Sequence, residues 1–224
     1  MNPRIKMYAA LLMVAFLVFP CITSARSDAK KAEKARGEKI LLFNGKDLSN
    51  WEFFLKNSSA DPATVFTTGK GVIHMNPFPW GYMRTKDSYS DYKLHVEWRW
   101  PSVATNSGVF VHYQPRDSNT FRWIECNLVA GGAGDFICEK GIDMDERIDK
   151  SKGNIKKLAE SSEKKVGKWN TMEVVCNGNK MEVFVNKVLQ NKATNLNVHE
   201  GSICLQCEGK DIEFRNVYLT KLKK

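Results

Sequence analysis

Amphipathic helices are almost absent from this 224-residue sequence. Its segments rarely place apolar residues at the three- and four-residue spacing of a helix, and the charged stretch 139–168 also lacks a sustained helical period. Parallel sheets need long crossover connections, usually helices, so this absence disfavours a parallel α/β fold. Roughly a dozen short alternating segments, separated by turn signals, instead predict an all-β sandwich or barrel.

Several common catalytic and metal-binding signatures are also missing. No Glu-x-Asp-x-x-Glu segment is present, although β-glucanases of sandwich type use that spacing to set nucleophile and acid on one strand face. The glycine-rich run 131–134 precedes no helical pattern, which argues against a phosphate-binding loop. In the acidic run that starts at Asp143, Arg147 occupies the third ligand position of a calcium loop and no glycine follows. No serine-nucleophile motif is present either.

The cysteines form no regular framework. Beyond Cys21 they are five in number, so at least one thiol is unpaired within the chain. Cys204 and Cys207 lie in an alternating segment, where their spacing directs them to opposite faces. Metal ligands must converge, so we expect no zinc or redox site there.

The basic charge is concentrated near the N-terminus. Of the formal net charge of +9, residues 1–36 supply +5, through seven basic and two acidic residues. The rest of the chain is only mildly basic, so a nucleic-acid partner is not expected. Residues 26–38 are rich in basic side chains and are typical of a solvated tether.

Residues 1–25 are typical of a secretory signal peptide. A basic start precedes an apolar run over residues 8–20, which is shorter than the ~20 residues of a membrane span. We expect cleavage after Ala25, export to the periplasm or cell envelope, and a single domain over residues 39–224. Processing at Cys21 would instead leave a lipid anchor, which is the only membrane attachment that the sequence suggests.

The most informative pattern is the alternation of apolar and functional polar residues over residues 94–100, 109–114 and 124–128. Period 2 puts one row on each face of a strand. In two stacked antiparallel sheets, we expect the apolar rows to meet between the layers and the polar rows to form one broad outer face. Such a face suits sugars, because hydroxyls need hydrogen-bonding groups and pyranose C–H faces need aromatic rings. The expected interior residues are Leu94, Val96, Trp98, Trp100, Val109, Val111, Ile124, Cys126 and Leu128.

Several segments, taken in order, resemble the bacterial 3-keto-disaccharide hydrolase domain family. They are LFNGKDLSNW (42–51), NSGVFVH (106–112), IE (124–125) with AGDF (133–136), KWNT (168–171), and LQCEG (205–209) continuing to IEFRN (212–216). Each motif alone is weak, but their order and spacing make the match fairly specific across nearly the whole expected domain. The resemblance implies a concanavalin A-like jelly roll of two curved antiparallel sheets, and an activity on oxidised glycosides.

The sequence departs from the family pattern in three places. Asn127 stands where relatives often have Gln, Asn186 and Lys187 replace the usual Asn-Gly turn, and the insert 139–168 follows no family pattern. A loop as long as this insert is usually functional or mobile. The shape of the substrate therefore stays open.

Glu125 and His112 are the candidate catalytic residues. Glu125 matches the family glutamate, and a carboxylate on a partly desolvated sheet face can have its pKa raised toward the working pH. His112, on the face opposite Val111, could abstract a proton, orient a hydroxyl or bind a metal. The alternatives are a structural ion pair of Glu125 with Arg99 or Arg122, and a plain hydrogen-bonding role for His112.

The other candidate residues could bind sugar hydroxyls or stack on a sugar ring. Surface pairing or solvation explains the charged ones equally well, and we expect Trp51 in the core, whereas a proline-rich loop places Trp80 outside it. With one polar face, His112, Glu125 and Gln206 should line a single pocket. The candidate substrate-binding residues are His95, Glu97, Arg99, Asn127, Gln206, Glu208, Trp80 and Tyr82.

Three functions fit these residues. The resemblance implies an exported enzyme for 3-keto glycosides, in which Glu125 or His112 removes the acidic C2 proton, the C1 group leaves, and water adds. The other residue, or a bound divalent cation, would polarise the keto oxygen, and no other cofactor is expected. The alternatives are a non-catalytic carbohydrate-binding module, and an ordinary acid–base glycoside hydrolase that pairs Glu125 with Glu97 or Glu208.

Overall fold

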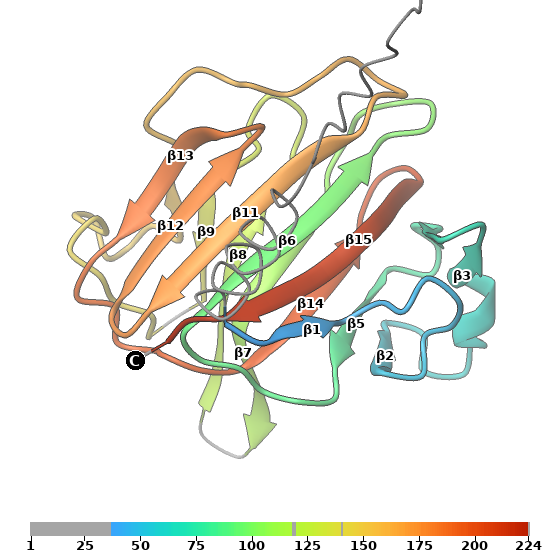
Figure 1. Cartoon of the computed structure of the whole chain (residues 1–224), viewed down its shortest axis with the longest axis horizontal. Coiled ribbons are helices and arrows are strands. Elements are labelled where there is room, and N and C mark those ends of the chain that lie inside the picture. The colour runs from blue at the N-terminus through green and yellow to red at the C-terminus, as the bar shows by residue number, and fades with distance from the viewer. Residues whose placement is uncertain (1–36, 118–119, 140, 224) are drawn as a thin grey trace, which may run out of the picture. The chain divides into compact units, whose positions relative to one another are not determined.

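Two antiparallel sheets make up the fold (Figure 1). The computed structural model describes residues 37–117, 120–139 and 141–223, and in these ranges the only helix is the short 3-10 turn η1 (Pro62–Thr64). The predicted all-β sandwich is confirmed.

Neighbouring strands are antiparallel in both sheets. The eight-stranded sheet has the order β13-β12-β11-β6-β15-β4-β3, with β1 also paired to β15. Its strands are β1 (Lys39–Leu41), β3 (Phe66–Gly69), β4 (Val72–Met75), β6 (Tyr92–Arg99), β11 (Asn170–Asn177), β12 (Lys180–Val185), β13 (Val188–Ala193) and β15 (Ile212–Lys221). The seven-stranded sheet has the order β10-β9-β8-β7-β14-β5-β2. Its strands are β2 (Trp51–Leu55), β5 (Gly81–Thr85), β7 (Gly108–Asp117), β8 (Thr120–Asn127), β9 (Phe136–Cys138), β10 (Asn154–Ile155) and β14 (Ser202–Cys207).

One row of side chains from each long strand packs into a single apolar core. On β6 the residues from Tyr92 onward alternate strictly between buried and partly exposed. All nine residues that the sequence places in the interior are at most 3 % exposed, and Trp51 is buried there as well. Burying one large apolar side chain stabilises a fold by ~1.5–3 kcal/mol, so these rows decide which face of each strand points inward.

The sheet order separates polar rows that the sequence analysis placed on one face. β6 belongs to the eight-stranded sheet, whereas β7 and β8 belong to the seven-stranded sheet. Both sheets turn their apolar rows inward, so His95, Glu97 and Arg99 lie on the opposite side of the sandwich from Glu125. The prediction of one broad polar face is therefore wrong, because alternation fixes the face of a strand but not the sheet that the strand joins.

A β-bulge in β7 redirects His112. The pairing of β7 with β8 shifts register just after Val111, and His112 has a φ of 50°. Because a bulge adds one residue to its strand, Val111 and His112 both point inward and Tyr113 takes the outer face. The His112 ring lies 6.1 Å, centroid to centroid, from the buried ring of Tyr92. The prediction that His112 shares a face with Glu125 is wrong, because strict alternation does not allow for an inserted residue.

The charged insert 139–168 connects the two sheets. Ile142 and Met144 pack into the core. The buried Arg147 guanidinium donates hydrogen bonds to the carbonyls of Ile142, Lys150 and Lys152, at 2.5, 3.1 and 2.9 Å. These buried contacts anchor the first part of the insert to the core.

The five cysteines from Cys126 onward are buried free thiols. Cys207 lies in the main core, whereas Cys204 packs with aromatic rings on the outer side of the seven-stranded sheet, so the two do point to opposite faces. Among the described residues no helix is long and apolar enough to cross a membrane. The predicted signal peptide (1–25), Cys21 and the tether up to residue 36 lie outside the described residues.

Replacing His112 with Phe should reduce the loss of the free energy of unfolding as the pH falls below 6.5. Burial lowers the pKa of His112 from 6.5 to about 4, so the native state stays neutral while the unfolded chain gains a proton. The free energy of unfolding is therefore unaffected by His112 above pH 6.5. It falls by about 3 kcal/mol in total as the pH drops toward 4.

Urea unfolding of both proteins between pH 4 and 7 measures this difference. The exposed His199 offers a comparison: its charge contributes less than burial to the lowered pKa of His112, so His199→Gln should keep most of the dependence of stability on pH. Parallel loss of stability in the parent and His112→Phe proteins would contradict a buried neutral ring.

Candidate functional site

The outer face of the seven-stranded sheet carries a continuous set of polar and aromatic side chains. Glu125 on β8 lies opposite Phe110 on β7, and Phe110 lies opposite Cys204 on β14. Cys204 in turn lies opposite Arg84 on β5. Directly opposite residues of antiparallel strands share a face. Glu125 and Arg84 are therefore on one surface, about 15 Å apart across three strand spacings.

Glu125 is a buried carboxyl group on this face. Glu125 is only 7 % exposed, and it lies directly over Gly108, where a Cβ atom would overlap the carboxylate. Burial, and secondarily the charge of Glu208, raises the pKa of Glu125 to about 8. The alternative of an ion pair with Arg99 is excluded, because Arg99 lies on the other sheet and pairs with Glu213. At neutral pH Glu125 is therefore mainly a protonated acid.

Glu208 stands beside Glu125 and is held by two side-chain amides. Nδ2 of Asn106 and Nε2 of Gln206 each donate to Oε2 of Glu208, both at 3.1 Å. Within the described residues, Oε1 of Glu208 receives no hydrogen bond, and the buried amide oxygens of Asn106 and Gln206 meet no donor. Unsatisfied buried acceptors are costly and invite donors from a ligand. This cluster is thus suited to hydroxyl groups.

Asn127 contributes to the same face mainly by shaping the strand end. Its Oδ1 accepts a hydrogen bond from the backbone N–H of Val129 at 2.8 Å, which fixes the turn after β8. Asn127 also pairs directly with Gly108, the residue beneath the Glu125 carboxyl. The side chain is buried, so it helps to hold the glycine in place.

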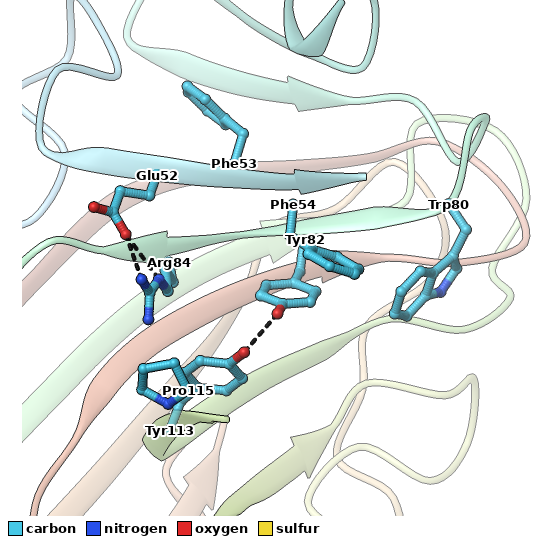
Figure 2. A pocket seen from close by; sticks show the side chains of 8 residues that line it. All are labelled: Glu52, Phe53, Phe54, Trp80, Tyr82, Arg84, Tyr113 and Pro115. Atoms are coloured by element: carbon cyan, nitrogen blue, oxygen red, sulfur yellow. Dashed lines mark hydrogen bonds and ion pairs between the residues drawn. The ribbon is translucent and has the colours of Figure 1, made fainter. Parts of the chain in front are cut away.

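A pocket of about 580 Å³ opens on the same face, over β2 and β5 (Figure 2). Tyr82 and Tyr113 meet there through a 2.5 Å hydrogen bond between their hydroxyls. Phe54 stacks on Tyr82 with ring centroids 4.8 Å apart, and Trp80 meets Tyr82 edge-on at 6.1 Å. The lining residues are Glu52, Phe53, Phe54, Trp80, Tyr82, Arg84, Tyr113 and Pro115.

Aromatic rings connect this pocket to the carboxyl pair. The Tyr82 ring lies 6.0 Å from Phe110, and Phe110 stacks on Trp123 at 4.9 Å. Trp123 precedes Glu125 by two residues on β8, so both project to the same side. Gln206 is also the cross-strand partner of Tyr82. The pocket and the polar cluster are adjoining parts of one surface.

Three predicted site residues belong to a separate network on the eight-stranded sheet. Glu97 accepts hydrogen bonds from Arg215 and Asn216, at 2.7 and 2.8 Å. His95 stacks on Tyr218, and Arg99 pairs with Glu213. His95, Glu97 and Arg99 therefore do not meet Glu125, and their ion pairs match the surface-pairing alternative. The predicted convergence of His112 with Glu125 and Gln206 fails as well, because His112 points into the core.

Seven residues of the pocket and of the Glu208 cluster were not singled out from the sequence, namely Glu52, Phe53, Phe54, Arg84, Asn106, Tyr113 and Pro115. Asn106 begins the family segment NSGVFVH, and this signal could have marked it. Tyr113 reaches the outer face only because of the bulge. Glu52, Phe54 and Arg84 do alternate on short strands, and this spacing could have marked them as one face. In the described part of the chain, no group of three or more His, Cys, Asp or Glu side chains is placed to hold a metal ion.

The chain matches the 3-keto-alpha-glucoside-1,2-lyase-like domain family over residues 38–220. No protein of curated function matches it significantly in sequence. Several solved structures are similar at low identity. A candidate glycosyl hydrolase from Parabacteroides distasonis is 19% identical, with a TM-score of 0.58, covering 83% of this chain and 100% of its own.

Two further similar structures are a glucanase and a carbohydrate-binding module. A β-glucanase from Bacillus licheniformis is 13% identical, with a TM-score of 0.57, covering 84% of this chain and 99% of its own. The carbohydrate-binding module CBM66 from Bacillus subtilis is 11% identical, with a TM-score of 0.54, covering 75% of this chain and 93% of its own. These likenesses confirm the predicted jelly-roll fold. Because the family match covers most of the chain, this protein belongs to the 3-keto-alpha-glucoside-1,2-lyase-like domain family.

Proposed function

We propose that this protein cleaves 3-keto glycosides by elimination followed by hydration, on the outer face of the seven-stranded sheet. One observation carries the proposal: a buried carboxyl, Glu125, stands next to a second carboxylate, Glu208, whose charge raises its pKa further. An acid and a base side by side suit a substrate whose ketone makes the neighbouring C–H acidic. Family membership supports the same chemistry.

In the proposed reaction Glu208 is the base and Glu125 is the acid. Oε1 of Glu208, which accepts no hydrogen bond from the described residues, removes the proton from C2 of the sugar. The electrons of that C–H bond form a C2=C3 double bond while the keto oxygen takes the proton of Glu125. This assignment replaces His112, which the core holds away from the surface.

Departure of the aglycone completes the elimination. The enol proton returns to Glu125, the 3-keto group is restored, a C1=C2 double bond forms, and the C1–O bond breaks. The leaving oxygen receives the proton that Glu208 took from C2. Water then adds across C1=C2, with hydroxyl at C1 and hydrogen at C2. The net reaction consumes one water and yields a free 3-keto sugar and an alcohol.

Ordinary acid–base hydrolysis remains a second use of the same pair. Of its two proposed pairings, Glu125 with Glu97 is ruled out because Glu97 lies on the other sheet. The pairing with Glu208 fits the geometry. Turnover of unoxidised glycosides would favour this reaction over elimination.

A carbohydrate-binding module is the second candidate function. The observation that favours it is the aromatic pocket, which could bind a sugar ring without help from Glu125. Binding and product release, measured on the parent protein, distinguish the two functions. Affinity for a 3-keto glycoside without release of its alcohol, with or without added divalent metal, would identify a module.

We also propose that the chain is exported, as residues 1–25 predict. Protein recovered from the periplasmic or secreted fraction should begin at Arg26, as N-terminal sequencing would show. A chain that begins at a modified Cys21 would indicate a lipid anchor instead.

Cleavage should slow as the pH rises through about 8, because ionisation of Glu125 removes the acid. The measurement is kcat for a 3-keto aryl glucoside between pH 6 and 10, after subtraction of the uncatalysed elimination. A rate that rises through pH 8 would make Glu125 the base and contradict the proposed division of roles.

Glu125→Gln should remove turnover and add stability. We expect kcat to fall by about 10²- to 10⁴-fold with sugar affinity retained. In the parent protein the unfolded carboxyl ionises from pH 4.5, whereas the native one stays protonated to about pH 8, so stability is lost over that range. The variant should thus be more stable at pH 7 by on the order of 3 kcal/mol, and no more stable below pH 4.

Urea unfolding and product release, measured on the same samples, check both effects. Glu97→Gln is the matched control on the opposite sheet and should keep turnover. Full activity in Glu125→Gln would exclude Glu125 from the reaction.

A further inference from the structure

The polar side chains of the 580 Å³ pocket already bind one another. Arg84 donates through Nε to Oε2 of Glu52 at 2.9 Å and approaches the same oxygen through Nη2 at 2.6 Å. The hydroxyls of Tyr82 and Tyr113 form the second pair (Figure 2). Burial raises the pKa of both tyrosines, so the hydroxyls stay uncharged. The pocket consequently presents chiefly ring faces and ring edges to a ligand.

Three of its five aromatic side chains are open to solvent, whereas Tyr82 and Tyr113 are buried. Phe54 is 48% exposed, and Trp80 is only partly buried. The two rings meet edge-on at 6.3 Å, and both contact Tyr82. Clustered exposed apolar side chains with a hollow between them mark a binding site for an apolar group.

The pocket lies at a suitable distance from the carboxyl pair. Tyr82 is the direct cross-strand partner of Gln206, which in turn binds Glu208. Neighbouring strands are about 5 Å apart, so a group attached to a sugar at Glu208 and Glu125 enters the pocket after one or two strand spacings.

From these three observations we propose that the pocket binds the aglycone of the substrate and that this aglycone carries a planar aromatic ring. The proposal rests on the proposed cleavage of 3-keto glycosides and specifies the group that leaves. A second sugar ring would bring several hydroxyls to a pocket in which the two tyrosine hydroxyls bind each other and Arg84 binds Glu52, so that chiefly Oε1 of Glu52 and Nη1 of Arg84 remain to bind them. Hydroxyls that are buried without a partner are costly. An aromatic ring needs only the stacking and edge contacts that Phe54, Trp80 and Tyr82 offer.

The test compares 3-keto glucosides of one anomeric form that differ only beyond the leaving oxygen. The 2-phenylethyl and ethyl glucosides both release primary alcohols, so the phenyl ring changes binding with little change in the leaving group. The 3-keto form of a disaccharide is the third substrate. We expect kcat/KM to be about tenfold or more higher for the phenylethyl glucoside than for the other two, because the ring buries apolar surface.

Variants connect that preference to the pocket. Phe54→Ala and Trp80→Ala should each reduce the phenylethyl-to-ethyl ratio of kcat/KM severalfold. Urea unfolding of each variant shows that it is folded. Ile148→Ala removes an exposed apolar side chain that does not line the pocket and should keep the ratio.

Binding to the Glu125→Gln variant separates this inference from the proposed function. A preference of about tenfold in Kd for the phenylethyl glucoside, lost in the double variants with Phe54→Ala or Trp80→Ala, supports an aromatic subsite even when no substrate is cleaved. Cleavage of 3-keto glycosides with equal kcat/KM for the phenylethyl and ethyl compounds, or with preference for the disaccharide, would overturn the inference and leave the function standing.

Discussion

Every long strand of this fold gives one row of side chains to a shared apolar interior, and this demand governs the rest of the structure. The rows of β6, β7 and β8 bury residues such as Trp98, Val109 and Ile124 almost completely. Because this burial stabilises the fold strongly, the other row of each strand must lie on one of the two outer faces. Among the described residues, a buried acid, a second carboxylate and an aromatic pocket come together on the face of the seven-stranded sheet.

Glu125 shows how stability and reactivity oppose each other at this face. The carboxyl lies against Gly108, where any larger residue would push it away, and burial holds it protonated near neutral pH. A buried ionisable group lowers stability wherever the unfolded chain would ionise it. The amides of Asn106 and Gln206 stabilise the neighbouring Glu208 as an acceptor. A buried, protonated acid therefore lies beside a hydrogen-bonded carboxyl group, an arrangement that suits the proposed acid–base chemistry.

The opposite face has many of the same residue types arranged for a different purpose. There Glu97 and Glu213 are each engaged by arginine, and Arg99 and Arg215 both lie over the Trp169 ring. These carboxylates are satisfied by cations, whereas Glu125 lies against a glycine and another carboxylate. Partners, more than residue type, distinguish a structural network from a candidate reactive one.

The sequence by itself determined the layers and the interior. Period-2 alternation identified all nine expected core residues and the opposite directions of Cys204 and Cys207, because burial of one row per strand is a local property. The family match of the sequence also pointed to Glu125, Gln206 and Glu208. Tertiary structure alone decided which sheet each strand joined, and so removed His95, Glu97 and Arg99 from the site. It also placed His112 in the core, because one inserted residue in β7 reverses the side on which the following side chains lie.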